Sequence, residues 1–208
     1  MFNLNLSAEK KTALFACIRQ FFYLSAIMLF VFGINVTASV YNGETFEEHG
    51  IIENLQFFLL VACSVIFLLS SYIKKDKREI FLLLASVSIF ASIRECDMFF
   101  DENLPVISWK FAWIFPISAF VYAVKHFERT KDQVFEFIAS PAFNMMVAAV
   151  IVVIPIAQCI GHRSLVINVL GNRDVGQIKE FFEECVETIG YFVLFLSAIE
   201  SFWSFSKK

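Results

Sequence analysis

The sequence has little of what marks a soluble enzyme or a nucleic-acid-binding protein. Only 18% of its 208 residues are charged, and the formal net charge is −3, whereas soluble domains carry about 25% charged residues. A protein that neutralises phosphates needs a basic surface, so this composition excludes nucleic acid as a partner. The chain has only three histidines, His49, His126 and His162. The membrane topology predicted below places His126 on the inner side, so a catalytic zinc held by three histidine ligands is disfavoured.

Cysteine, glycine and proline are also scarce. The five cysteines include no C-x-x-C pair and are odd in number, so the sequence predicts no disulfide framework. One disulfide among Cys96, Cys159 and Cys185 stays an open alternative.

Only Pro116 and Pro155 fall well inside apolar runs, and the seven glycines form no G-x-x-x-G pair. Transporters with broken helices need more interruptions, so this class is disfavoured.

Hydrophobic residues are abundant: they make up 58% of the chain, and the mean hydropathy is +0.68. Six apolar runs are long enough to cross about 30 Å of hydrocarbon, and such runs without period-2 alternation form helices in lipid. The predicted spans are Phe21–Val40, Ile52–Ile73, Ile80–Phe100, Ser108–Val124, Ile138–Ile160 and Phe181–Phe205. We therefore predict an all-α, polytopic integral membrane protein in which residues 1–208 form one domain, a bundle of six transmembrane helices.

The segments between these spans are short and polar. One of them is Lys125–Phe137, and the dipeptide Ser140-Pro141 that follows it predicts the cap and the first position of the fifth helix. Lys and Arg gather on one side of the spans, so the positive-inside rule places both termini in the cytoplasm. We expect the chain to lie in the cell inner (plasma) membrane.

The N-terminal segment is open to two interpretations. Residues 1–20, with Ser7 as a cap and a basic stretch after it, are predicted to form an amphipathic lead-in at the inner interface. A secretory signal cleaved after Val36-Thr37-Ala38 is the competing interpretation, and it would remove the first helix without changing the orientation of the loops.

Ionisable residues enter three of the predicted spans at similar depth. The run Ile80–Ile93 is too short to cross alone, so its helix is expected to continue through Arg94 to Phe100. The sixth span is expected to begin near Glu180 for the same reason. A charge near the centre of a lipid-exposed helix costs about 2.5–3.5 kcal/mol, so such groups turn inward and pair. We expect a polar centre near the outer face.

This centre contains more carboxylates than positive charges. The potential metal ligands are Glu53, Glu95, Asp97, Glu184 and Glu187, and the residues expected to pair with them or to support them are His49, Asn54, Gln56, Arg94, Lys110 and Glu183. Three interpretations stay open: a structural lock between spans, a site for Ca²⁺, Mg²⁺ or Mn²⁺, and a proton-responsive centre that includes His49.

The segment Glu47-Glu48-His49-Gly50-Ile51-Ile52-Glu53-Asn54 resembles the acidic, calcium-binding entry segment of the alkaline ceramidase-like membrane hydrolases. The resemblance implies a metal-dependent hydrolase that acts on a lipid. It covers only this segment, and the late His-x-x-x-His zinc ligands of that family have no counterpart in the sixth span.

The function favoured by the sequence is binding or sensing rather than catalysis. No Ser-His-Asp or Cys-His set at matching depth supports nucleophilic catalysis. We therefore expect a membrane protein whose carboxylate and arginine centre responds to a cation, a proton or an envelope ligand, alone or as the membrane subunit of a larger system. The lipid bilayer is its expected partner, and a second copy of the chain or a cytosolic or membrane protein partner stays open.

Overall fold

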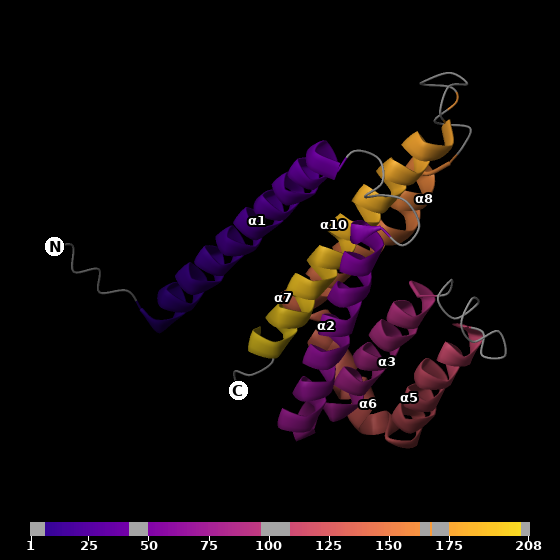
Figure 1. Ribbon diagram of the computed structural model, residues 1–208. Coiled ribbons are helices and arrows are strands. Elements are labelled where there is room, and N and C mark those ends of the chain that lie inside the picture. Colours follow the sequence, from indigo (N-terminus) through magenta and orange to yellow (C-terminus); the bar gives the residue numbers. More distant parts are fainter. Residues whose placement is uncertain (1–6, 42–49, 97–108, 163–166, 168–174, 205–208) are drawn as a thin grey trace.

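The computed structural model describes residues 7–41, 50–96, 109–162, 167 and 175–204, and every regular element in these ranges is helical (Figure 1). This confirms the predicted all-α class. The α-helices are α1 (Ala8–Tyr41), α2 (Ile51–Ile73), α3 (Arg78–Arg94), α5 (Ile114–Lys125), α6 (Phe127–Ile138), α7 (Pro141–Ile151), α8 (Ala157–Ile160) and α10 (Val175–Ser204). The 3₁₀ turns η2 (Lys75–Lys77) and η3 (Trp109–Trp113) and the π-helical turn η4 (Val152–Ile156) connect them.

Four helical stretches are long and apolar enough to cross a membrane. They are Lys10–Val40, Ile51–Ile73, Pro141–Ile160 and Ile178–Trp203. They correspond to the first, second, fifth and sixth predicted spans. The apolar windows of α2 and α10 are 39% and 50% buried, against 11% for those of α1 and of the α7–α8 stretch. The pair α2 and α10 therefore forms the centre of the bundle.

The third and fourth predicted spans differ from the structure. The helix α3 ends at Arg94 and does not run on to Phe100 as an α-helix. The N–H groups of Glu95 and Cys96 bond back to the carbonyls of Ala91 and Ile93, which closes the last turn. Residues 97–100 lie outside the described residues. The fourth span begins with the 3₁₀ turn η3, and its α-helical part is α5.

Most residues of the polar separator Lys125–Phe137 form α6, a helix that hydropathy alone does not predict. Polar side chains lie on both the buried and the exposed side of this helix. The side chains of Thr130, Gln133 and Phe137 are buried, whereas those of Glu128 and Lys131 are exposed. An amphipathic helix of this kind is stabilised by packing one face and solvating the other.

Polar contacts at both ends of α2 fix its direction relative to α10. Gln56 reaches Glu184 near the start of both helices, and the Lys74 ammonium donates to the carbonyls of Ser201 and Phe202 at their far ends. The two helices therefore run parallel. The short turn η2 makes α3 antiparallel to α2. A hydrophobic core fills the space between the helices, and its buried side chains are Cys63, Phe67, Ile80, Phe81, Ala85, Phe137, Ala142 and Ala198.

The α7–α8 stretch runs antiparallel to α10. Ser140 caps it by accepting a hydrogen bond from the N–H of Phe143 at 3.3 Å, as the Ser140-Pro141 dipeptide predicts. Pro155 lies in η4, where a proline that lacks an N–H widens the helix to a π-turn. Opposite this turn, a Cβ atom at Gly190 would overlap Val153. Glycine thus permits the close approach of α10 to η4.

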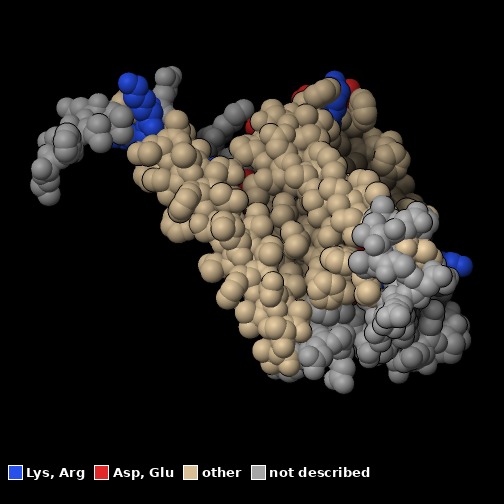
Figure 2. All heavy atoms as spheres, turned by 90° about the horizontal axis from the view of Figure 1, so that it is seen from above, with Lys and Arg blue, Asp and Glu red and all other residues tan. Residues whose placement is uncertain are grey.

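The helix α1 lies at the edge of the bundle beside α10 (Figure 1). The ring of Phe30 stacks on Phe192 with centroids 4.0 Å apart, and Ile34 packs against Ile52. Most large apolar side chains of α1 are exposed, for example Leu29 at 71%. Seen from above, the described surface is mostly uncharged (Figure 2). The exposed apolar side chains of α1 are suited to contact with lipid.

The cysteines are free in the structure. Cys63 is buried, and Cys17 and Cys159 are exposed. The alternative of one disulfide among Cys96, Cys159 and Cys185 is therefore not realised.

Candidate functional site

The contact between α2 and α10 is built around the buried side chain of Gln56, which is 1% exposed. Its amide nitrogen lies 2.7 Å from Oε2 of Glu184 and 2.9 Å from the hydroxyl of Thr188. The Thr188 hydroxyl in turn donates to the Glu184 carbonyl at 2.6 Å. These residues lie one helical turn apart on α10, so a single glutamine bridges two turns.

The contact between α3 and α10 is made by Glu95, directly after the last residue of α3. Its Oε1 accepts a hydrogen bond from the phenol of Tyr191 at 2.7 Å. The same oxygen lies 3.2 Å from a guanidinium nitrogen of Arg94. Tyr191 is 5% exposed, so this phenol is the buried partner of the Glu95 carboxylate.

Glu187 joins the two contacts. Its side chain is buried on α10, and its carboxylate lies within electrostatic range of Glu95, Glu184, Glu183 and Arg94. The structure thus brings Gln56, Arg94, Glu95, Glu184 and Glu187 together from α2, α3 and α10, with Thr188 and Tyr191 beside them. We call these residues the carboxylate centre. Thr188 and Tyr191 were not among the expected site residues, although Tyr191 follows Glu187 by four residues on the same helical face.

The other expected residues lie around this centre or outside the described residues. Glu53 acts electrostatically on Glu184, whereas Asn54 donates to the carbonyl of Gly50 within its own helix at 2.9 Å. Glu183 pairs with Lys179 at 3.1 Å, and its carboxylate packs against Gly161.

Lys110 is exposed in η3. His49 and Asp97 lie outside the described residues.

The position of Arg94 differs from the expectation that it turns inward as the main counter-charge. Its side chain is 51% exposed, against 10% for Glu95. The physical reason is the end of α3: Arg94 is the last helical residue, so its side chain reaches the rim of the centre. The buried carboxylates therefore depend on neutral donors, Tyr191 and Gln56, more than on a buried cation.

No group of three or more His, Cys, Asp and Glu side chains within the described ranges is arranged to hold a metal ion. Metal binding by Glu53, Glu95, Asp97, Glu184 and Glu187 stays a prediction, because Asp97 lies outside those ranges. The alternative of a metal-dependent hydrolase likewise gains no support from the described residues.

A second polar contact, which sequence reasoning missed, ties α1 to α10 near the other end of the bundle. Glu200 is fully buried, and its Oε2 lies 2.7 Å from Nε of Arg19 and accepts a hydrogen bond from Tyr23 at 2.8 Å. Arg19 and Tyr23 are four residues apart on one face of α1. The signal in the sequence is a glutamate inside the apolar sixth span, but the sequence does not reveal its partner.

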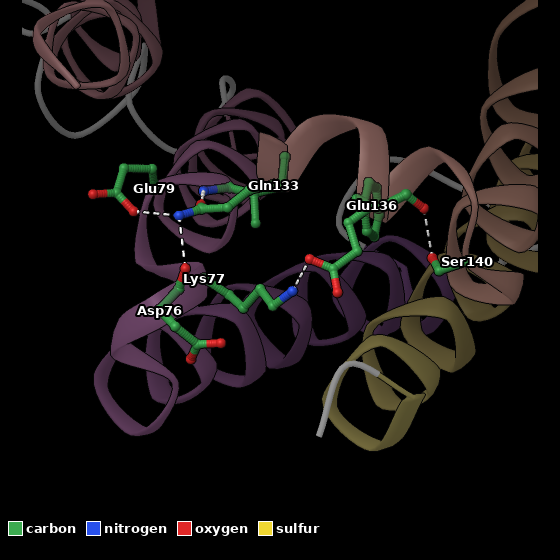
Figure 3. A network of polar contacts seen from close by, with 8 residues as sticks. Asp76, Lys77, Glu79, Gln133, Glu136 and Ser140 are labelled. Carbon is green, nitrogen blue, oxygen red and sulfur yellow. Dashed lines mark hydrogen bonds and ion pairs between the residues drawn. The ribbon is translucent and has the colours of Figure 1, made fainter. Parts of the chain in front are cut away.

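A third network joins α6 to the turn between α2 and α3 (Figure 3). The amide of Gln133 donates to the carbonyl of Asp76 at 2.8 Å and to the carboxylate of Glu79 at 2.7 Å. Lys77 forms an ion pair with Glu136. A cleft of about 520 Å³ opens beside this network, lined by Lys75, Asp76, Lys77, Arg129, Asp132, Gln133 and Glu136.

Of these networks, the carboxylate centre is the one in which carboxylates from α3 and α10 lie close together beside α2. It lies where α2, α3 and α10 meet. No family model, no curated protein and no solved structure matches this chain.

Proposed function

We propose that the chain is a multi-pass protein of the cell inner (plasma) membrane that senses protons through its carboxylate centre. The observation that carries this proposal is the burial of Glu187 beside Glu95 and Glu184. Carboxylates that lie close together repel one another, and binding of a proton or a cation relieves this repulsion. Sensing of protons is the better-supported response, because oxygens of Glu95 and Glu184 already accept hydrogen bonds from Tyr191 and Gln56.

The position of the centre supports a sensing role. It lies where three helices meet, so a change of charge on Glu187 alters the contact of α10 with both α2 and α3. A local change of charge at a packed joint of this kind biases one helix arrangement over another. The response is transmitted along α10, whose far end is tied to α1 through Glu200.

In the proposed topology the chain crosses the membrane six times. The third crossing is α3, and the fourth is made by η3 and α5 together. The 17 residues of α3 cover about 25 Å, and 17 residues is the short end of the range for a transmembrane helix. The five residues of η3 and the 12 of α5 together cover about 28 Å. Both segments pack beside the long apolar α2 or its neighbour α3, which supports a common depth.

The proposed orientation places the end of the bundle that carries η2 and α6 in the cytoplasm. Its basic residues are Lys74, Lys75, Lys77, Arg78, Lys125, Arg129 and Lys131, and such a concentration of positive charge is typical of a cytoplasmic face. Single cysteines test this orientation in a background without native cysteines. We expect a membrane-impermeant thiol reagent to label Lys110→Cys and Glu180→Cys in intact cells, and to leave Lys75→Cys and Lys131→Cys unlabelled. The opposite pattern contradicts the orientation.

Melting curves of the purified full chain test the sensing role. Between pH 8 and pH 5, uptake of a proton by the centre should raise the melting temperature of the wild type. Glu187→Gln, which cannot ionise, should lose at least half of that rise. Glu180→Gln is the matched control, because Glu180 lies on the same helix with an exposed side chain, and it should keep the rise.

Two outcomes of this experiment contradict proton sensing. The first is an identical pH profile for the wild type and Glu187→Gln. The second is a rise in melting temperature caused by CaCl₂, MgCl₂ or MnCl₂ at constant pH that a chelator reverses and that Glu187→Gln lacks, because the centre is then a cation site.

A further inference from the structure

A groove runs between α3 and α5 on the outside of the bundle, with a volume of about 260 Å³. One wall contains Leu82, Ala85 and Ile89 of α3, and the other contains Phe115, Ala119 and Tyr122 of α5. On each helix these residues recur at three- and four-residue spacing over seven positions, so each wall is one continuous helical face. The groove therefore follows both helix axes for about 10 Å.

The interior of the groove is apolar even though two serines contribute to its walls. The hydroxyl of Ser86 donates to the carbonyl of Leu83 at 2.7 Å, and that of Ser118 donates to the carbonyl of Phe115 at 2.9 Å. Each hydroxyl is thus satisfied by the backbone of its own helix. An occupant of the groove meets hydrocarbon surface and needs no polar groups of its own.

One end of the groove is basic. The guanidinium of Arg78 lies over the ring of Tyr122, 5.9 Å from its centroid. Arg78 precedes Leu82 by four residues on α3, and Lys125 follows Tyr122 by three residues on α5, so both extend the groove walls by about one turn. Both side chains are exposed. The groove thus combines an apolar channel with two positive charges about 5 Å beyond its end.

We propose that this groove binds an anionic phospholipid, with one acyl chain between α3 and α5 and the phosphate beside Arg78 and Lys125. The groove and a phospholipid are complementary in charge, because a phospholipid also places its negative charge immediately beyond the start of its hydrocarbon chains. Basic pockets between transmembrane helices on the cytoplasmic side suit anionic headgroups, and this end of the bundle is the proposed cytoplasmic end. The site is separate from the carboxylate centre.

Melting of the delipidated full chain in detergent tests this proposal. Phosphatidylglycerol should raise the melting temperature more than phosphatidylcholine with the same acyl chains. Arg78→Gln removes a phosphate contact and Ala119→Phe fills the groove, so each should lose at least half of the extra shift. The matched controls are Arg129→Gln, an exposed cation on α6, and Ala148→Phe, an exposed alanine on α7, and both should keep it.

A second measurement needs no variant, so it stays informative if Ala119→Phe fails to fold. Phosphatidylglycerol with a photoreactive group on its acyl chain should crosslink wild-type protein mainly within 82–89 and 115–122. Crosslinks spread over the exposed faces of α1 and α7 contradict the proposal, as does an equal melting shift from both lipids. The proposal is also overturned if phosphatidylglycerol has no effect and the purified chain forms a dimer that buries the groove, because the occupant is then a second copy of the chain.

Discussion

The Nε atom of Arg19 on α1 lies 2.7 Å from Oε2 of Glu200 on α10, and this contact is an ion pair without hydrogen-bond geometry. The phenol of Tyr23 donates to the same oxygen, while Oε1 of Glu200 is buried with no hydrogen-bond partner. Glu200 is fully buried and Arg19 is 30% exposed. A carboxylate in this position depends on its few partners, so α1 is held to the bundle by charge as well as by the Phe30 ring.

Arg19→Ala should therefore destabilise the protein. Breaking a fully buried ion pair costs about 3–5 kcal/mol, and we expect the lower end, about 3 kcal/mol, because Arg19 is partly exposed. Denaturant unfolding in mixed micelles measures the loss. Lys131→Ala is the control, since the pair of Lys131 with Glu128 at 3.1 Å is exposed, and it should cause no measurable change. Adding Glu200→Gln to Arg19→Ala should restore much of the stability, and an absence of any restoration would contradict the ion-pair account.

Tyr191→Phe should destabilise the carboxylate centre more than Arg94→Ala does. The variant keeps the packing of the ring but leaves an oxygen of Glu95 without its buried donor, which costs roughly 1–3 kcal/mol. Arg94 is about half exposed, so solvent screens the loss of its charge. Tyr72→Phe is the control, because Tyr72 is 80% exposed. A larger loss for Arg94→Ala, measured by unfolding in micelles, would show that the guanidinium is the main partner.

Gly190→Ala should destabilise the packing of α10 on η4, whereas Gly33→Ala should not. At Gly190 the added methyl group meets Val153, including its backbone nitrogen at 3.2 Å, and overpacking of this kind costs about 1–3 kcal/mol. At Gly33 the added methyl group meets no atom within 4 Å outside its own stretch of helix, so alanine should stabilise α1 by up to about 1 kcal/mol. Melting temperatures of the two variants should shift in opposite directions, and a shift of the same sign would contradict this packing.

Lys74, directly after α2, should make stability depend on pH in the alkaline range. Burial lowers the pKa of Lys74 below its usual 10.5, and the neighbouring Lys77 lowers it further, although Asp76 acts in the opposite direction. Between the folded pKa and 10.5, the unfolded chain binds more protons than the folded one, so the free energy of unfolding rises with pH. Lys74→Met should reduce this slope, and Lys75→Met, which changes an exposed neighbour, should not. Equal slopes for both variants would contradict the burial of a charged Lys74.

The local signals in the sequence predicted the parts of the fold that depend on one helix at a time. The apolar run Ile52–Ile73 became α2 with a shift of one residue at its start, and Ser140-Pro141 capped α7 as expected. Each of these features depends on residues within one or two turns of the chain. The end of α3 at Arg94 and the helical α6 were not predicted, because hydropathy measures the length of an apolar run and does not register where packing and turn hydrogen bonds end a helix.

The sequence by itself determined that the described chain is helical, that it has long apolar stretches, and that polar residues enter the second, third and sixth of them. Only the tertiary structure decided which side chains meet. Tyr191 rather than Arg94 is the buried partner of Glu95, and Arg19 of the first helix pairs with Glu200 of the last. The physical reason is that periodicity fixes the face on which a side chain lies, whereas its partner depends on how far each packed helix is rotated and shifted against its neighbour.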